Sequence, residues 1–216
     1  MLTGWIIMKF NTYLDNKKTL KLIHDTSIRE VILEHKTLSR MGRLDTDSLL
    51  SLTDAALESG LSPVLQWDTL CTESNFENCI KLLDDLPLSK FAAIRVQDIG
   101  AAEWVRHELP EIPLHFIAET GNHNLTGLLR WHEYFGQQLQ RFALSSELPI
   151  STLNNYCRSL TVPCEILAAG RILLFYTPRK LLGNYESSKN SFDFKEKILV
   201  PSDQPHRQFP TLENQH

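Results

Sequence analysis

Polar side chains follow several short apolar runs of this sequence, at the points where β-strands would end. In parallel β/α proteins the carboxyl ends of the strands carry the active site, so these side chains are candidates for chemistry. Paired carboxylates at such positions can exchange protons or bind a cation, and arginines can clamp a carboxylate or phosphate. The expected ring consists of Glu34, His35, Gln66, Asp68, Gln97, Asp98, Glu119, Ser145, Glu147, Gly170, Arg171 and Arg179.

Each member of this ring, taken alone, is more typical of a solvated loop than of a catalytic group, because every barrel exposes polar strand ends. The ring as a set is therefore the stronger indication of a site. The sequence has neither a phosphate-binding glycine loop nor a nucleophile elbow. His132 and Glu133 lack the second histidine of a zinc-protease helix, so we predict that they belong to a polar helix face.

Composition and cysteine usage narrow the class of protein. Cys71, Cys79, Cys157 and Cys164 form no C-x-x-C metal clip, and we expect no metal site. No export signal is recognisable, so we expect reduced thiols with structural roles in a cytoplasmic protein. The net charge of −4 gives no overall basic field for nucleic acid, although a local basic patch is still allowed. No apolar run reaches the roughly 18 residues that a membrane helix needs.

The elements that must position the ring alternate between two periods. Short β-type runs alternate with longer helix-type runs, which is typical of βα units and a parallel sheet. We predict strands over 5–14, 30–34, 63–67, 92–97, 114–118, 140–144, 164–168 and 172–176. We predict helices over 16–24, 46–59, 75–84, 101–109, 125–135 and 150–160.

This pattern predicts an α/β fold of the TIM-type (β/α)8 barrel class over residues 1–180. No helical pattern closes the barrel after the last strand, so we expect it to be incomplete or truncated at its C-terminus. Residues 181–216 are predicted to form an irregular tail, the start of a truncated segment, with one strand near 197–200. A doubly wound open sheet is the competing fold, but its first βα turn usually carries a glycine-rich loop, and residues 13–17 contain no glycine.

Four stretches also occur in the order found in a known family. They are 92–100 (AAIRVQDIG), 114–124 (LHFIAETGNHN), 142–148 (FALSSEL) and 164–179 (CEILAAGRILLFYTPR). These stretches resemble segments of the collagenase-like peptidase family U-32, and the loop with Arg40 and Arg43 before a leucine-rich helix fits as well. The resemblance implies a barrel fold. Some members of that family are proteases or collagenases, and others serve RNA base hydroxylation or oxygen-independent ubiquinone hydroxylation.

The resemblance also implies particular site residues. The positions that match the family pattern are Asp98, Asn124, Glu147, Glu165, Gly170 and Arg179. Together with the ring, the candidate catalytic residues are Asp98, Glu119, Glu147 and Glu165. The candidate ligand-binding residues are Arg43, Asn124, Arg171 and Arg179.

Departures from the family pattern bear on cofactors. Several relatives carry an iron–sulfur cluster on four cysteines, but two of those positions hold Leu173 and Lys180 here. Such clusters need thiolate ligands, so we expect no cofactor. The resemblance then implies a peptidase that acts on peptides. The alternative is a non-proteolytic, cluster-free barrel that binds a small carboxylate or pairs with a homologous family member in RNA or ubiquinone hydroxylation. A degraded paralogue with little activity is the third hypothesis.

Overall fold

The computed structural model describes residues 8–119, 124–170, 172–177 and 195–213. The chain divides into two compact units, Met1–Leu173 and Leu174–His216. The first unit holds the alternating strands and helices, and the second holds a two-stranded hairpin.

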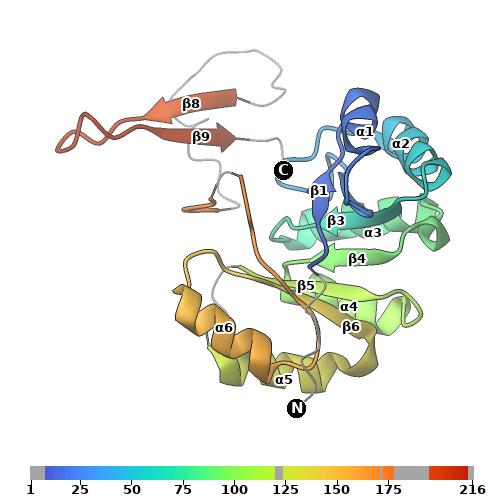
Figure 1. The fold of residues 1–216 in the computed structure, drawn as a ribbon. Coiled ribbons are helices and arrows are strands. Elements are labelled where there is room, and N and C mark those ends of the chain that lie inside the picture. Colours follow the sequence, from blue (N-terminus) through green and yellow to red (C-terminus); the bar gives the residue numbers. More distant parts are fainter. Residues whose placement is uncertain (1–7, 120–123, 171, 178–194, 214–216) are drawn as a thin grey trace. The chain divides into compact units, whose positions relative to one another are not determined.

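Seven parallel strands form one sheet in which each strand pairs with the next one along the chain (Figure 1). They are β1 (Asn11–Tyr13), β2 (Glu30–Glu34), β3 (Ser62–Trp67), β4 (Ala93–Val96), β5 (Leu114–Ala118), β6 (Leu139–Leu144) and β7 (Cys164–Glu165). Parallel neighbours need long crossover connections, and helices provide them here. The predicted alternation of strands and helices is therefore confirmed.

Helices connect the successive strands of the sheet. They are α1 (Lys17–Ile23), α2 (Thr46–Glu58), α3 (Glu73–Asp85), α4 (Ile99–Glu108), α5 (Leu125–Phe135) and α6 (Ile150–Ser159), with short 3-10 helices η1 (Leu88–Lys90) and η2 (Gly136–Gln138). The side chains of Asn16, Asp45, Asp98 and Asn124 accept hydrogen bonds from first-turn N–H groups, which otherwise lack partners. None of the helices in the described ranges is both long and apolar enough to span a bilayer.

The sheet is curled. The evidence is that side chains from strands that are not neighbours meet on its inner face. Arg141 on β6 forms an ion pair with Glu30 on β2, and Arg95 on β4 forms one with Glu165 on β7. Asn11 on β1 donates a hydrogen bond to Glu165, with 2.8 Å between Nδ2 and Oε2. This bond joins the two edge strands, which a flat sheet would hold far apart. The fold is therefore an α/β barrel-like half-barrel.

The hydrophobic core lies between the outer face of the curled sheet and the helices, which line that face in Figure 1. Strand residues that belong to this core include Leu33, Leu65, Val96, Phe116 and Leu144. Apolar residues at the alternate strand positions are buried but stand outside that cluster: Ile32, Val64, Ala93, Ile117 and Ala143. Because successive side chains of a strand point to opposite faces, the remaining inner positions are where polar groups gather.

The predicted eighth strand at 172–176 is wrong. Residues 172–177 form no strand, and Ile172, Leu174 and Phe175 are exposed. An apolar run indicates burial, but it cannot show whether another element is present to cover it. The first strand begins at Asn11 rather than at residue 5, although residues 5–7 lie outside the described residues. The seventh strand ends at Glu165 rather than at residue 168.

The second unit is more regular than predicted. Its strands β8 (Lys195–Leu199) and β9 (Phe209–Glu213) pair antiparallel, so the described part of the tail holds two strands rather than one. The predicted domain boundary at residue 180 lies outside the described residues.

Candidate functional site

The carboxyl ends of β2 and β3 bring two carboxyl groups and a hydroxyl group together. Glu34 is the last residue of β2, and Asp68 follows directly after β3. Ser39 lies between them, with its Oγ 2.6 Å from Glu34 Oε1 and 2.9 Å from Asp68 Oδ1. Gln66 Nε2 donates to both carboxyl groups, at 3.2 Å to Glu34 Oε1 and 2.9 Å to Asp68 Oδ2. We call these four residues the carboxyl–hydroxyl cluster.

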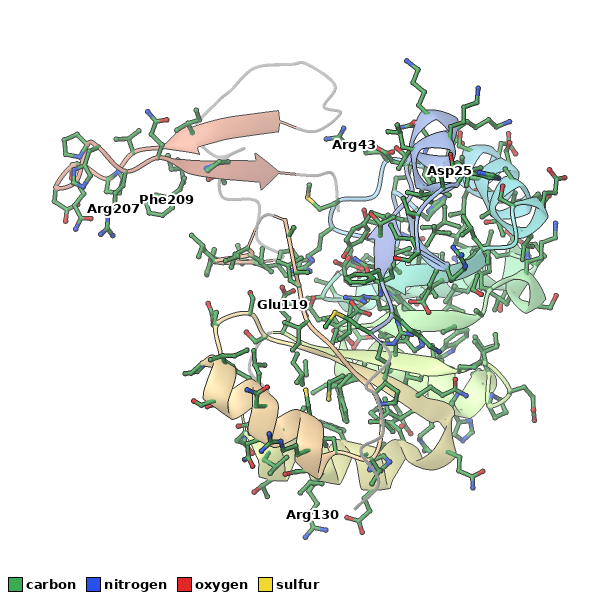
Figure 2. All side chains as sticks on the ribbon, viewed as in Figure 1. Asp25, Arg43, Glu119, Arg130, Arg207 and Phe209 are labelled. Atoms are coloured by element: carbon green, nitrogen blue, oxygen red, sulfur yellow. The ribbon has the colours of Figure 1, made fainter. Side chains whose placement is uncertain are left out.

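Arg40 ties this cluster to β5. Its backbone N–H donates to Asp68 Oδ1 over 2.8 Å, and its Nε donates to Asp68 Oδ2 over 2.7 Å. Its Nη2 also donates to Glu119 Oε2 over 3.3 Å, and Figure 2 labels Glu119, the residue directly after β5. Asp68 therefore sits among several donors, two of them from Arg40. Charge-assisted bonds of this kind stabilise an ionised carboxylate.

The loop between β2 and α2 holds Ser39 and Arg40 through its backbone. The Asp68 N–H donates to Leu38 O over 3.1 Å, which fixes the loop against the end of β3. The Gly42 N–H donates to Ser39 O over 3.0 Å and closes a turn. A Cβ on Gly42 would lie 2.2 Å from His35 O, so only glycine allows this close approach.

Electrostatics bring the pKa of Glu34 close to neutral pH. Burial raises the pKa of the Glu34 carboxyl most strongly, and the charge of Asp68 raises it further, to about 7. The charges of Arg40 and Arg95 act in the opposite direction but do not cancel the rise. A carboxyl group that titrates near neutral pH is suited to general acid–base catalysis.

A second polar group lies nearer the amino ends of the strands. Arg141 Nη2 donates to Glu30 Oε2 over 2.9 Å, and Arg141 Nη1 lies 3.1 Å from Glu165 Oε2. Burial alone would raise the pKa values of Glu30 and Glu165, but the neighbouring arginines outweigh it and lower both. Burial, and next the charge of Arg141, lower the pKa of His115 to about 4, so this imidazole is neutral at physiological pH. We call Asn11, Glu30, Arg95, Arg141 and Glu165 the lumen network; it links strands of the curled sheet.

The predicted catalytic residues fall in different places. Glu119 joins the carboxyl–hydroxyl cluster through Arg40, whereas Glu165 belongs to the lumen network. Asp98 caps α4 and accepts the Ala101 N–H over 3.0 Å. Glu147 is exposed in the loop before α6.

The predicted ligand-binding residues do not converge in the described part of the chain. Asn124 caps α5 and accepts the Gly127 N–H over 2.7 Å. Arg43 is exposed on the β2–α2 loop and is labelled in Figure 2. Arg171 and Arg179 lie outside the described residues.

Sequence reasoning did not single out Ser39, Arg95, Arg141 or Glu30. A signal was present for Arg95, which stands between Ile94 and Val96 in a strand pattern and must therefore face away from them. Ser39 gave no signal, because its role depends on Asp68, 29 positions away.

The four cysteines are free thiols, and they influence one another in two pairs. The neighbouring Cys79 thiol lowers the pKa of Cys71. Burial, and then the neighbouring Cys157, raise the pKa of Cys164 to about 12. Within the described ranges, no three His, Cys, Asp or Glu side chains are placed to hold a metal ion.

Comparisons with known proteins agree with the fold. Peptidase family U32 matches residues 16–192, which include every element of the carboxyl–hydroxyl cluster. The solved structure of the U32 peptidase Mk0906 is similar, with a TM-score of 0.56 and 14% identity over 77% of this chain and 71% of that chain. At this identity the likeness shows the fold alone. The comparison with curated proteins gave no match. Because the family match spans most of the sequence, this chain belongs to peptidase family U32.

Proposed function

We propose that this chain is a hydrolase of the peptidase type, in which Glu34 exchanges protons with an amide substrate. The family supports peptide-bond hydrolysis as the reaction class. The observation that carries the proposal is the Glu34 carboxyl at the end of β2, whose pKa of about 7 suits it to accept and donate a proton near neutral pH.

The contacts of Glu34 leave one of its oxygens for a substrate. Oε1 lies against Ser39 and Gln66, whereas Oε2 has no hydrogen-bond partner among the described residues. Asp68, only 2% exposed at its side chain, is enclosed by donors and does not meet a substrate directly. Glu34 is therefore the catalytic residue of the proposed site.

The proposed reaction needs one water molecule and no cofactor. Water gives a proton to Glu34 Oε2 while its oxygen attacks the amide carbonyl carbon. The leaving nitrogen then takes a proton from Oε2 as the C–N bond breaks, and the carboxyl group returns to its starting state. General acid–base catalysis of this kind contributes roughly 10²–10⁴-fold to a rate.

A non-proteolytic, cluster-free barrel is the second proposal. It is supported by Leu173 at a position where relatives carry a cluster cysteine, and by the separation of the cysteines into two pairs. Such a protein would bind a small carboxylate or a homologous family member rather than cleave peptides. Iron and sulfide in anaerobically purified protein would contradict it.

Peptide cleavage by the full chain tests the first proposal. We expect wild type and Glu58→Gln to cleave gelatin or a mixed peptide library. Mass spectrometry of the products detects the cleavage. Glu58 is exposed at the end of α2 and provides the same loss of charge away from the site. We expect Glu34→Gln to lose about 100-fold or more in kcat. Absence of cleavage at any pH, with or without divalent metal, would reject the peptidase proposal.

A further inference from the structure

The Ser39 hydroxyl lies within hydrogen-bond distance of two carboxyl oxygens but has only one proton. Its Oγ is 2.6 Å from Glu34 Oε1 and 2.9 Å from Asp68 Oδ1. A hydroxyl group donates one hydrogen bond and can accept others. Both short contacts are therefore hydrogen bonds only if one carboxyl group carries a proton and donates it to Oγ.

The surroundings of the two carboxyl groups decide which one carries this proton. Asp68 accepts from the backbone N–H and Nε of Arg40 and from Gln66 Nε2, and these three donors stabilise its ionised form. Glu34 accepts only from Gln66 besides its contact with Ser39. The proton therefore belongs to Glu34, and the bonds run from Glu34 to Ser39 and from Ser39 to Asp68.

We propose that Ser39 is a proton-relay residue that connects Glu34 to the buried carboxylate of Asp68. Glu34 Oε1–H donates to Ser39 Oγ, and the Ser39 hydroxyl donates to Asp68 Oδ1. Ser39 is fully buried and Asp68 is 1% exposed, so neither touches the substrate, and both are positioning residues. The relay rests on the proposed function for its role in catalysis, although its proton arrangement exists without a substrate.

The relay moves each proton by one hydrogen bond. As water gives a proton to Glu34 Oε2, the proton on Oε1 passes to Ser39 Oγ, and the Ser39 proton passes to Asp68 Oδ1. The O–H bonds that break are on water, Glu34 and Ser39, and those that form are on Glu34, Ser39 and Asp68. The transfers run backward when the leaving nitrogen takes its proton from Oε2. The guanidinium of Arg40 favours ionised Asp68, so the proton returns promptly.

The charged and titratable groups around Glu34 come from every element that packs against it. They are Tyr13 on β1, Arg40 in the β2–α2 loop, Asp68 after β3 and Arg95 on β4. A test of the relay must leave these four groups unchanged. Substitution of Ser39 does so, because a serine hydroxyl carries no charge.

The pKa of Glu34 tests the relay without reference to activity. Carbon-13 NMR of glutamate-labelled full chain follows the Glu34 carboxyl through a pH titration, and the spectrum of Glu34→Gln assigns its signal. Ser39→Ala removes the acceptor of the Glu34 proton, so we expect the Glu34 pKa to fall. Ser39→Thr keeps a hydroxyl group and should restore the wild-type value. Ser59→Ala is the matched control, because its hydroxyl bonds Ala55 O at the exposed end of α2.

The alternative arrangement predicts the opposite shift. If Ser39 only donates to ionised Glu34, its removal raises the Glu34 pKa, and that result would overturn the relay. An unchanged pKa in Ser39→Ala would overturn it as well. If Ser39→Thr does not fold, as judged by near-ultraviolet circular dichroism, the direction of the Ser39→Ala shift still decides.

Kinetics separate failure of the relay from failure of the proposed function. If wild type cleaves peptides, we expect Ser39→Ala to lose about 100-fold in kcat with little change in KM, and Ser39→Thr to recover most of it. Cleavage that depends on Glu34 but not on Ser39 would overturn the relay and keep the function. If wild type does not cleave, the function fails, and the Glu34 pKa shift alone judges the relay.

Discussion

At the residue scale, the same side chain has opposite properties at two places in this fold. Glu34 and Glu165 are both glutamates whose burial favours the neutral form. Glu34 lies beside the negative charge of Asp68, and its pKa rises to about 7. Glu165 lies beside Arg95 and Arg141, and its pKa falls. Neighbouring charge, not residue type, therefore decides the property of each glutamate. Glu34 becomes a candidate acid–base group, whereas Glu165 becomes one partner of a structural ion pair.

The raised pKa of Glu34 has a consequence for stability. The folded state keeps a proton on this carboxyl up to a pH of about 7, whereas the unfolded chain releases it near the ordinary value of 4.5. This group's contribution to stability is therefore complete below pH 4.5 and is lost as the pH rises to about 7. The loss amounts to at most about 3 kcal/mol in the free energy of unfolding.

Urea unfolding over this pH range measures the effect. Wild type should lose stability relative to Glu34→Gln as the pH rises, because glutamine cannot ionise. Glu58→Gln, an exposed substitution of the same kind, should follow wild type. Parallel pH profiles for wild type and Glu34→Gln would show that Glu34 titrates normally.

At the element scale, the β2–α2 loop converts a strand end into a site. Its contacts with β3 put Ser39 between two carboxyl groups that come from different strands. The turn that ends at Gly42 is the tightest point of the loop, because Gly42 packs on the backbone of His35.

Gly42→Ala should therefore disturb both stability and the site. The added Cβ would lie 2.2 Å from His35 O, so the turn must move and carry Arg40 with it. We expect a loss of about 1–3 kcal/mol in the free energy of unfolding, the usual cost of forcing atoms into a packed region. Chemical denaturation measures it. Gly100→Ala, inside α4, is the control and should change stability by less than about 1 kcal/mol, because alanine favours a helix. Equal stability of the two variants would contradict the role of the turn.

At the scale of the whole first unit, the lumen network holds the sheet in its curled form. It joins β6 to β2, β4 to β7 and β1 to β7, pairs that share no backbone ladder. Each ion pair is largely enclosed: Arg141 and Glu30 have side-chain exposures of 18% and 19%. Removal of one partner leaves the other charge enclosed and unneutralised.

Arg141→Gln should destabilise the protein far more than a surface substitution of the same type. We expect a loss of about 3 kcal/mol in the free energy of unfolding, because Glu30 and Glu165 lose a shared cation. Arg130→Gln breaks the ion pair of Arg130 with Glu133, in which the two side chains are 76% and 69% exposed. This substitution should lower the free energy of unfolding by less than about 1 kcal/mol. Thermal unfolding of the two variants at one pH compares them. Similar melting temperatures would show that the network does not stabilise the curl.

Local patterns predicted most of the elements. The strand Leu114–Ala118 and the helix Leu125–Phe135 occur at their predicted bounds, because hydrophobic period, a cap at Asn124 and a stop at Gly136 all lie within a few residues. The eighth strand failed for the converse reason, since its apolar run depended on a covering element that the sequence does not specify locally.

By itself the sequence determined the alternation of strands and helices and the family, because each depends on residues close together in the chain or on their order. Only the tertiary structure decided which side chains meet. Arg40 reaches Glu119 across 79 positions, and Arg141 reaches Glu30 across 111. Such contacts depend on how far the sheet curls, and curvature results from the packing of all the strands and helices together. That is why sequence reasoning named Glu34 and Asp68 among the polar strand ends but not Ser39, which lies between them.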